Sequence, residues 1–131
     1  MLELIARLII DLSEQRLYAY GPSQVLLYSA LVSTGLPASP TPVGAFHIQA
    51  KYASTDLTGA TYQVKSVPHV MCLGGPGLGP DRYCIHPAPW QEQGGQCFGV
   101  PRSHGCIRTT VATARWLFER TAVGTPVEIR P

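Results

Sequence analysis

The sequence contains few charged residues and no concentration of charge of either sign. Only 14% of its 131 residues are charged, and 10 Lys and Arg residues against 8 Asp and Glu residues leave a net charge of +2. Proteins that bind nucleic acid or anionic membranes by electrostatics carry a basic patch or run. We therefore expect neither nucleic acid nor a membrane surface among the partners of this chain.

The sequence also lacks a long apolar segment and a recognisable export signal. No segment approaches the ~18 apolar residues of a membrane-spanning helix. The opening residues include Glu3, Arg7 and Asp11 and lack the basic head and small-residue cleavage site of a secretion signal. If the chain is full length, we expect it in the cytoplasm. If an export signal has been removed, we expect it in the periplasm or cell wall.

The sequence has four cysteines, but without an export signal and at this chain length they favour neither a disulfide scaffold nor a metal-dependent fold. A chain of this length buries roughly two-thirds of its unfolded surface on folding and needs neither disulfides nor a bound metal ion to be stable. Disulfides are rare in reducing compartments. We therefore expect one domain over residues 1–131, without cofactor or metal, and with four free thiols, at Cys72, Cys84, Cys97 and Cys106.

The first third and the end of the chain have the residue pattern of β-strands. Runs rich in branched and aromatic residues alternate with turn-forming segments such as SEQ and GPS. The first three runs predict an antiparallel meander. The predicted strands are RLIIDL (7–12), RLYAY (16–20), QVLLYSALVST (24–34), GAFHIQA (44–50) and PVEIR (126–130).

One amphipathic helix is predicted, over Val111 to about Ala122. Its apolar residues recur at helical spacing, Thr109 or Thr110 can cap its start, and Gly124 is suited to its end. The glycine-rich stretch 54–79 predicts an irregular segment. The class that we expect is mainly β, with packed sheets and one main helix near the C-terminus.

The segment PRSHGCIRTT places Cys106 among residues that suit a nucleophile. A free thiol has a pKa near ~8.5, so a catalytic cysteine needs a base. His104 is too close in the chain to hold the thiol in line, whereas His86 lies at the end of a strand-like run, where Pro87 and Pro89 end the strand. His86 is therefore the candidate base, held in one tautomer by a carboxylate, a hydroxyl or a backbone carbonyl, for instance that of Pro87.

The glycine before the cysteine predicts donors for a developing oxyanion. Gly105 permits a tight bend that aims the N–H groups of His104, Gly105 and Cys106 at one point. A non-enzyme alternative is a structural zinc site made of Cys84, His86, His104 and Cys106, although one-residue separations are shorter than zinc ligands usually have.

The pair IHPAPW (85–90) and SHGCIR (103–108) resembles the signature of the L,D-transpeptidase catalytic domain, the YkuD-type fold. IIDLSEQRLYAY and VSTGLPASPTPVGAFHI resemble the opening hairpin and the threonine-proline-glycine loop of that family. The resemblance implies a β-sandwich of mixed sheets with Cys106 as nucleophile and His86 as base. In the family the residue after this histidine orients it through its carbonyl, often from a serine, and here that residue is Pro87.

The resemblance also implies a substrate, the peptidoglycan stem tetrapeptide. Cys106 would attack the carbonyl of the third residue, a diamino acid, and expel the terminal D-alanine. The missing export signal favours water as acceptor, hence a cytoplasmic L,D-carboxypeptidase in peptidoglycan recycling. The alternative is a transpeptidase that forms 3-3 cross-links or exchanges D-amino acids.

Further side chains are candidates for the substrate cleft. Arg108 can pair with a substrate carboxylate through two parallel donors, or brace the loop. Trp90 would lie at the rim of the cleft or in its packing, and Tyr62 would line the cleft. The remaining candidates for substrate contact are Ser103 and His69, whereas Thr41, Pro42 and Gly44 have the pattern of turn residues.

Overall fold

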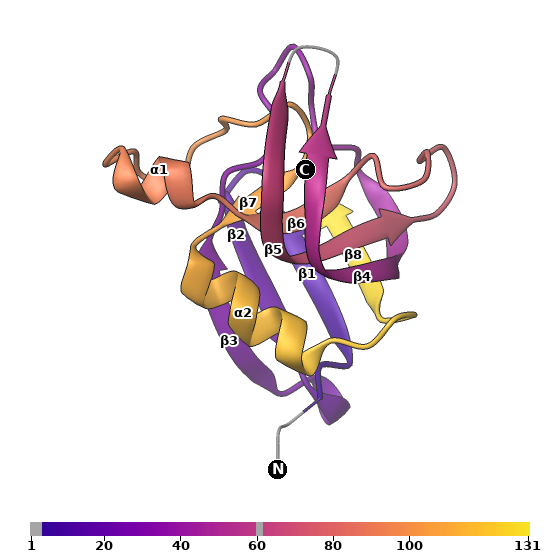
Figure 1. The fold of residues 1–131 in the computed structure, drawn as a ribbon. Helices are drawn as coiled ribbons and strands as arrows, with labels where there is room; N and C mark the ends of the chain where they lie inside the picture. Colours follow the sequence, from indigo (N-terminus) through magenta and orange to yellow (C-terminus); the bar gives the residue numbers. More distant parts are fainter. Residues whose placement is uncertain (1–3, 60–61) are drawn as a thin grey trace.

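The protein is a mixed, strongly curved β-sheet with a helix packed on it. The computed structural model describes residues 4–59 and 62–131 (Figure 1). The sheet has eight strands in the order β3-β2-β1-β8-β4-β5-β6-β7, and the class is therefore mainly β, as the sequence predicted. The strands are β1 (Arg7–Asp11), β2 (Arg16–Tyr20), β3 (Leu26–Leu31), β4 (Gly44–Thr58), β5 (Gln63–Gly74), β6 (Cys84–Pro87), β7 (Ile107–Thr109) and β8 (Pro126–Arg130).

The meander predicted for the N-terminal third is present. β1 pairs antiparallel with β2, and β2 pairs antiparallel with β3. β1 also pairs parallel with β8, so that β1 is an interior strand. Its residues Leu8, Ile9 and Ile10 are all buried, as expected for a strand covered on both faces. β2 and β8 instead alternate between buried and less buried positions.

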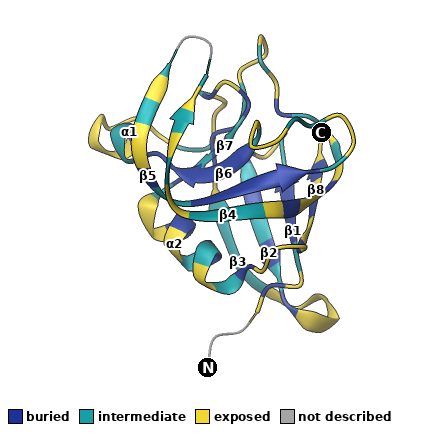
Figure 2. Ribbon diagram, turned by 45° about the vertical axis from the view of Figure 1, so that its right-hand side comes forward, coloured by how far each residue is buried: buried dark blue, intermediate teal, exposed yellow. Residues whose placement is uncertain are grey.

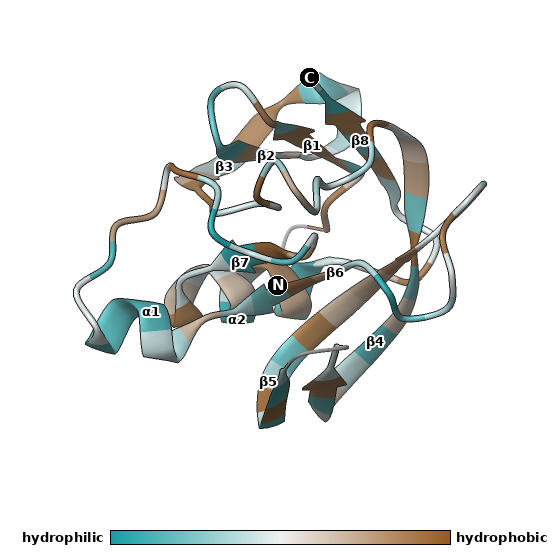
Figure 3. Cartoon of the chain, turned by 90° about the horizontal axis from the view of Figure 1, so that it is seen from above, coloured by the Kyte–Doolittle hydropathy of each residue, from teal (hydrophilic) through white to brown (hydrophobic). Residues whose placement is uncertain are grey.

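The curved sheet folds over so that its two halves face each other as the layers of a sandwich. Seen from above, β3, β2, β1 and β8 form one layer and β4 to β7 the other (Figure 3). Fully buried apolar side chains of both layers make one core, including Ile10 of β1, Ile85 of β6 and Ile107 of β7. The outer edge of β7 is covered by the segment that follows β3: Ser33 and Arg108 exchange two backbone hydrogen bonds, of 2.9 and 3.0 Å.

The prediction of an irregular middle was wrong for most of residues 54–79, although residues 75–79 do lie outside the strands. β4 and β5 form a long antiparallel hairpin, whose two strands occupy most of residues 44–74. Register shifts at Ile48/Ala50 and Thr55/Leu57, and left-handed backbone at Ser66, break the alternation of apolar and polar residues. The hairpin is buried near its base and more exposed toward its tip (Figure 2).

The predicted helix is α2 (Val111–Arg120), and its N-cap is Thr110, whose hydroxyl accepts a hydrogen bond from Thr113 N. The sequence missed two short helices, a 3-10 turn at Pro22–Gln24 and α1 (Pro89–Gln93). Each begins with a proline, which suits the first turn of a helix.

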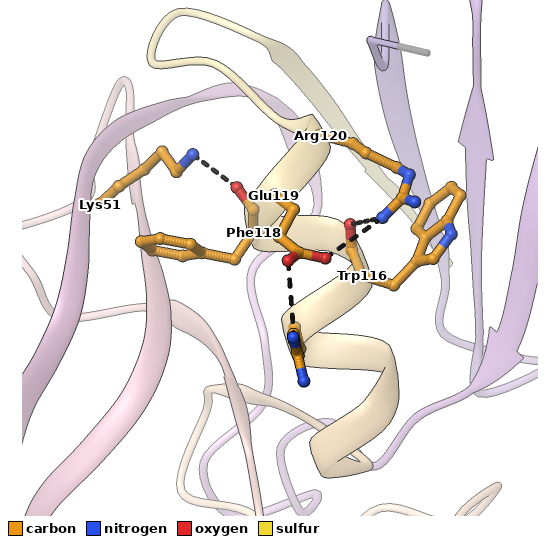
Figure 4. Close-up of polar contacts among 6 residues, drawn as sticks. Lys51, Trp116, Phe118, Glu119 and Arg120 are labelled. Carbon is orange, nitrogen blue, oxygen red and sulfur yellow. Dashed lines mark hydrogen bonds and ion pairs between the residues drawn. The ribbon is translucent and has the colours of Figure 1, made fainter. Parts of the chain in front are cut away.

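Lys51 of β4 fixes the C-terminal end of α2 to the sheet. Its ammonium donates to the carbonyl oxygen of Phe118 at 2.6 Å and lies 4.3 Å from the centroid of the Phe118 ring (Figure 4). It also donates to the carbonyl oxygen of Thr121 at 2.6 Å. On the other side of the helix, Trp116 stacks on Tyr28 of β3 with ring centroids 4.4 Å apart. α2 is thus tied to both layers.

Candidate active site

Strand pairing brings the two candidate catalytic side chains to one face of the sheet. β6 and β7 run parallel, with His86 opposite Arg108. Cys106 directly precedes β7, and residues two apart on a strand share a face. Cys84 N donates to the Cys106 sulfur at 3.4 Å, and the Cys106 thiol donates to Arg82 O at 3.7 Å. The sulfur is therefore held at the start of β7, next to β6.

His86 is buried and held by the carbonyl of the next residue. Only 4% of His86 is exposed, and its Nδ1 lies 2.7 Å from Pro87 O. Because a carbonyl oxygen only accepts, Nδ1 is the protonated nitrogen, and Nε2 keeps its lone pair. The carbonyl contact anticipated from the sequence is present, and it leaves Nε2 as the basic atom.

Cys106 and His86 line one small cavity of about 30 Å³. Burial lowers the pKa of His86 to about 4, an effect that the contact with Pro87 O opposes. Burial also raises the pKa of the Cys106 thiol above its ordinary value. Both groups are therefore neutral near pH 7, which makes the pair a thiol and an imidazole rather than a thiolate and an imidazolium. The other lining residues are Leu57, Tyr62, Val64, Trp90, Ser103, His104 and Arg108.

The loop before the nucleophile is held by hydroxyl groups. Ser103 Oγ donates to Cys106 O at 2.5 Å and accepts from Gly105 N at 3.1 Å. The Gly105 N–H is thus engaged within the loop and does not join the predicted oxyanion donors, for which the amides of His104 and Cys106 remain candidates. Gly105 has φ +131°, and a Cβ there would lie 2.7 Å from a ring carbon of Tyr83.

Thr41 is a positioning residue that the sequence analysis assigned to a simple turn. Its buried hydroxyl donates to Gly105 O at 2.7 Å and accepts from Gly35 N at 2.9 Å. The segment after β3 is therefore tied to the nucleophile loop across 64 residues of sequence. Nothing in the local pattern PTPVG distinguishes such a contact from ordinary turn chemistry.

Three further predicted side chains, those of Arg108, Trp90 and Tyr62, line the cavity that contains Cys106 and His86. The Arg108 guanidinium lies 5.4 Å from the centroid of the Trp90 ring, which is itself 6.0 Å from the His86 ring. Tyr62 stacks on His104 with ring centroids 4.7 Å apart, so that the β4–β5 hairpin reaches the nucleophile loop.

His69 does not lie at the site. Its ring packs against Phe118 of α2 at 5.3 Å, and it lines neither cavity that contains Cys106. His69 has left-handed backbone within β5, with φ +53°, and its side chain lies against the helix. The structure therefore does not support its predicted role in substrate contact.

A second, larger cavity also contains the nucleophile. It has a volume of about 210 Å³ and shares Cys106, Leu57 and Tyr62 with the smaller cavity. The thiol is therefore accessible from two adjoining spaces. The other residues that line the larger cavity are Tyr52, Thr55, Asp56, Thr58, Cys72, Asp81, Arg82 and Cys84.

The expectation of four free thiols was wrong. Cys72 of β5 and Cys84 of β6 form a disulfide, while Cys97 and Cys106 are free. The two bonded residues are direct cross-strand partners, which spacing along the sequence could not indicate. The disulfide also removes Cys84 from the alternative zinc site, because a metal ligand has to be a thiolate.

Within residues 4–59 and 62–131, no group of three or more His, Cys, Asp or Glu side chains is arranged to hold a metal ion. Over the same ranges, none of the helices has the length and apolar character needed to span a bilayer.

Comparisons with known proteins agree with this geometry. A family model described as the L,D-transpeptidase catalytic domain, YkuD, matches residues 5–129. L,D-transpeptidase 1 of Mycobacterium tuberculosis is 29% identical over 112 residues, covering 74% of this chain and 39% of that protein. The putative L,D-transpeptidase YciB of Bacillus subtilis is 25% identical over 134 residues, covering 92% of this chain and 63% of that protein.

Solved structures extend the comparison to the fold. A mutant Enterococcus faecium L,D-transpeptidase superposes with a TM-score of 0.81 at 25% identity, covering 96% of this chain and 50% of that one. The Ldtfm-avibactam carbamoyl enzyme superposes with a TM-score of 0.81 at 26% identity, covering 96% and 49%. This chain therefore spans less than two thirds of each of these four relatives. By its family match and its fold, the chain belongs to the L,D-transpeptidase catalytic-domain family.

Proposed function

We propose that the protein is a cysteine acyl-transfer enzyme that cleaves the L,D bond of a peptidoglycan stem tetrapeptide. The observation that carries the proposal is the arrangement of His86 and Cys106. One cavity contains both side chains, and the Pro87 carbonyl leaves the basic Nε2 of His86 free to face a substrate. A nucleophile, a base and a group that orients the base are the parts that acyl transfer requires.

The reaction follows from these parts. His86 Nε2 takes the proton of the Cys106 thiol as the sulfur attacks the carbonyl carbon of the third stem residue. The carbon–nitrogen bond to D-alanine then breaks, and the leaving nitrogen receives the proton from His86. A thioester on Cys106 remains. An acceptor gives its proton to His86 as it attacks the thioester, and the returning sulfur takes that proton back.

The neutral pair suits this order of events. Since the pKa of His86 is about 4, its imidazole is an unprotonated base throughout the neutral range. The thiol, whose pKa burial raises, loses its proton only as the new bond forms. Arg108, fixed beside Trp90 and with a nitrogen 3.5 Å from the Gln91 side-chain oxygen, supplies positive charge for a substrate carboxylate.

We favour an amine as the acceptor, in place of the water expected from the sequence. Two observations support this choice. The cavity of about 210 Å³ beside the nucleophile offers a second substrate a place next to the thioester. The Cys72–Cys84 disulfide is typical of proteins in an oxidising compartment, where cross-links are made. We therefore propose a transpeptidase that acts outside the cytoplasm.

The test is a product assay. The protein is incubated with a muropeptide tetrapeptide, with and without a free D-amino acid, and the products are followed by mass spectrometry. We expect exchanged or cross-linked product when an amine is present. Tripeptide and D-alanine alone, under both conditions, would assign the acceptor to water, and no release of D-alanine would refute the proposed chemistry.

Substitution at the nucleophile gives the matched control. Cys106→Ala is expected to abolish D-alanine release, because no other thiol lines the cavity that contains His86. Cys97→Ala should retain full activity, since Cys97 is exposed and contacts Arg102 instead. Full activity of Cys106→Ala would overturn the assignment of the nucleophile.

A further inference from the structure

Three cysteines that line the larger cavity lie side by side, on β5, on β6 and directly before β7. Cys72 of β5 is the cross-strand partner of Cys84 of β6. On the other side of β6, the parallel pairing with β7 begins at Ile85 opposite Ile107, so that Cys84 and Cys106 are the residues just before the first pair. Cys84 therefore has a cysteine neighbour on each side.

All three side chains face the same space. Cys72, Cys84 and Cys106 line the larger cavity together, and Cys106 packs against the buried cluster that contains the other two. Cys84 N donates to the Cys106 sulfur at 3.4 Å, so that sulfur contacts the backbone of one of the two disulfide-bonded residues. The nucleophile and the disulfide are thus parts of one cluster.

The spacing of the strands permits Cys84 to bond to either neighbour. Adjacent strands lie about 4.8 Å apart, close to the Cα separations of roughly 4.4–6.8 Å that a disulfide spans, and the Cα atoms of Cys72 and Cys84 are 3.9 Å apart. Cys106 precedes the strand on the other side of β6, so a bond between Cys84 and Cys106 joins neighbouring segments and requires a change of side-chain rotamers. Thiol–disulfide exchange requires a thiolate that can reach one sulfur of an existing disulfide, and Cys106 is placed for that attack.

We propose that Cys84 is a resolving cysteine for the nucleophile, and that the disulfide can move from Cys72–Cys84 to Cys84–Cys106. The Cys106 thiol loses its proton as its sulfur attacks the Cys84 sulfur, the Cys84–Cys106 bond forms, the Cys72–Cys84 bond breaks, and the Cys72 sulfur leaves as a thiolate that takes up that proton. No oxidant is consumed, since one disulfide replaces another. The exchanged form is inactive toward any acyl substrate, and the reverse attack by Cys72 releases the nucleophile.

The position of the disulfide then decides whether Cys106 is available. While Cys84 is bonded to Cys72, the nucleophile has no sulfur partner and stays free. If Cys72 is lost, Cys84 becomes a free thiol beside Cys106, and a disulfide oxidant such as oxidised glutathione joins the two and is itself reduced to two thiols. Cys72 would therefore protect the nucleophile, a role that goes beyond stabilising the sheet.

The experiment locates the disulfide directly and does not depend on an activity assay. Wild-type protein, Cys72→Ser and the double variant Cys72→Ser with Cys84→Ser are held in oxidised glutathione, blocked with iodoacetamide and digested without reduction. Mass spectrometry then identifies the cross-linked and alkylated peptides. Cys97→Ser, which changes an exposed cysteine outside the cluster, is the matched control.

We expect a Cys84–Cys106 peptide with alkylated Cys72 in part of the wild-type protein, and the same bridge in most of the Cys72→Ser protein. Alkylation of Cys106 in Cys72→Ser should then fall about tenfold relative to the double variant, in which Cys106 has no partner. Cys97→Ser should give the wild-type pattern. Circular dichroism and thermal melts show that each variant is folded before it is labelled.

Two results would overturn the proposal. If wild-type digests contain only the Cys72–Cys84 peptide, with Cys106 alkylated throughout, exchange does not take place. If folded Cys72→Ser shows separately alkylated or glutathione-bound Cys84 and Cys106, the two sulfurs cannot reach each other, and the pairing geometry is refuted.

Discussion

The two layers of the sandwich differ in regularity. In the layer formed by β3, β2, β1 and β8, the strands have five or six residues and pair with a single irregularity, at Ala19/Tyr20. In the other layer, β4 has 15 residues and β5 has 12, and β5 contains left-handed backbone at Ser66 and His69. The irregular layer carries the candidate active site. The layer without the site is thus built from short, regularly paired strands, whereas the layer that carries the site combines long strands with register shifts.

The largest expected effect is a loss of activity within the irregular layer. His86→Gln should lower turnover by about 10² to 10⁴, because a positioned general base contributes that much. His47→Gln, at an exposed position on β4, is the matched control and should change turnover little. D-alanine release by equal amounts of folded protein is the measurement. Equal rates for the two variants would mean that His86 is not the base.

A core substitution in the regular layer should produce the opposite result, a large loss of stability with turnover kept. Ile10 of β1 is fully buried. Ile10→Ala should lower the free energy of unfolding by about 2–5 kcal/mol through lost burial and the cavity left behind. Denaturant unfolding measures this. Val25→Ala, at a position 56% exposed, should stay within about 0.5 kcal/mol of wild type.

The buried imidazole of His86 should make the free energy of unfolding of the protein depend on pH. The pKa of His86 is about 4 in the folded protein, below its ordinary value of 6.5. The unfolded chain therefore binds the proton more readily, and stability is lost as pH falls from about 6.5 to 4, by roughly 3 kcal/mol in all. Unfolding followed between pH 4 and 7 should give a flatter profile for His86→Gln than for Ile10→Ala. The same slope in both would contradict the prediction.

The smallest expected effect concerns Lys51, whose contacts attach the C-terminal end of α2 to β4. Lys51→Met removes two hydrogen bonds to the last carbonyls of α2 and the contact with Phe118. It should lower the free energy of unfolding by about 1 kcal/mol. Lys65→Met, at an exposed position on β5, is the control. If both variants melt alike, Lys51 does not anchor the helix.

The features that were predicted from the sequence are those determined by residues close together along the chain. Short apolar runs between turn residues predicted the meander, and Thr110 marked the start of α2. The pair of motifs around His86 and Cys106 was recognisable because both motifs are short and specific. Each of these signals is made of short runs or motifs that are recognisable one by one along the chain.

The features that the sequence did not predict depend on register between distant segments. The Cys72–Cys84 bond needs β5 and β6 to align one pair of residues, and several pairings are open to four cysteines. The role of Thr41 depends on a contact with Gly105, 64 residues away. The β4–β5 hairpin was missed because its register shifts break the period of two by which strands are found.

The backbone hydrogen bonds between Ser33 and Arg108 protect the edge of the sheet against pairing with other molecules. A sheet that ends in an unpaired strand offers its free N–H and C=O groups to other chains. Here the strand that follows the nucleophile already has a neighbour on each side, β6 and the segment around Ser33. Its amide at Arg108 is therefore closed to strand addition by a second molecule, and the catalytic end of the sheet is guarded against edge-to-edge aggregation.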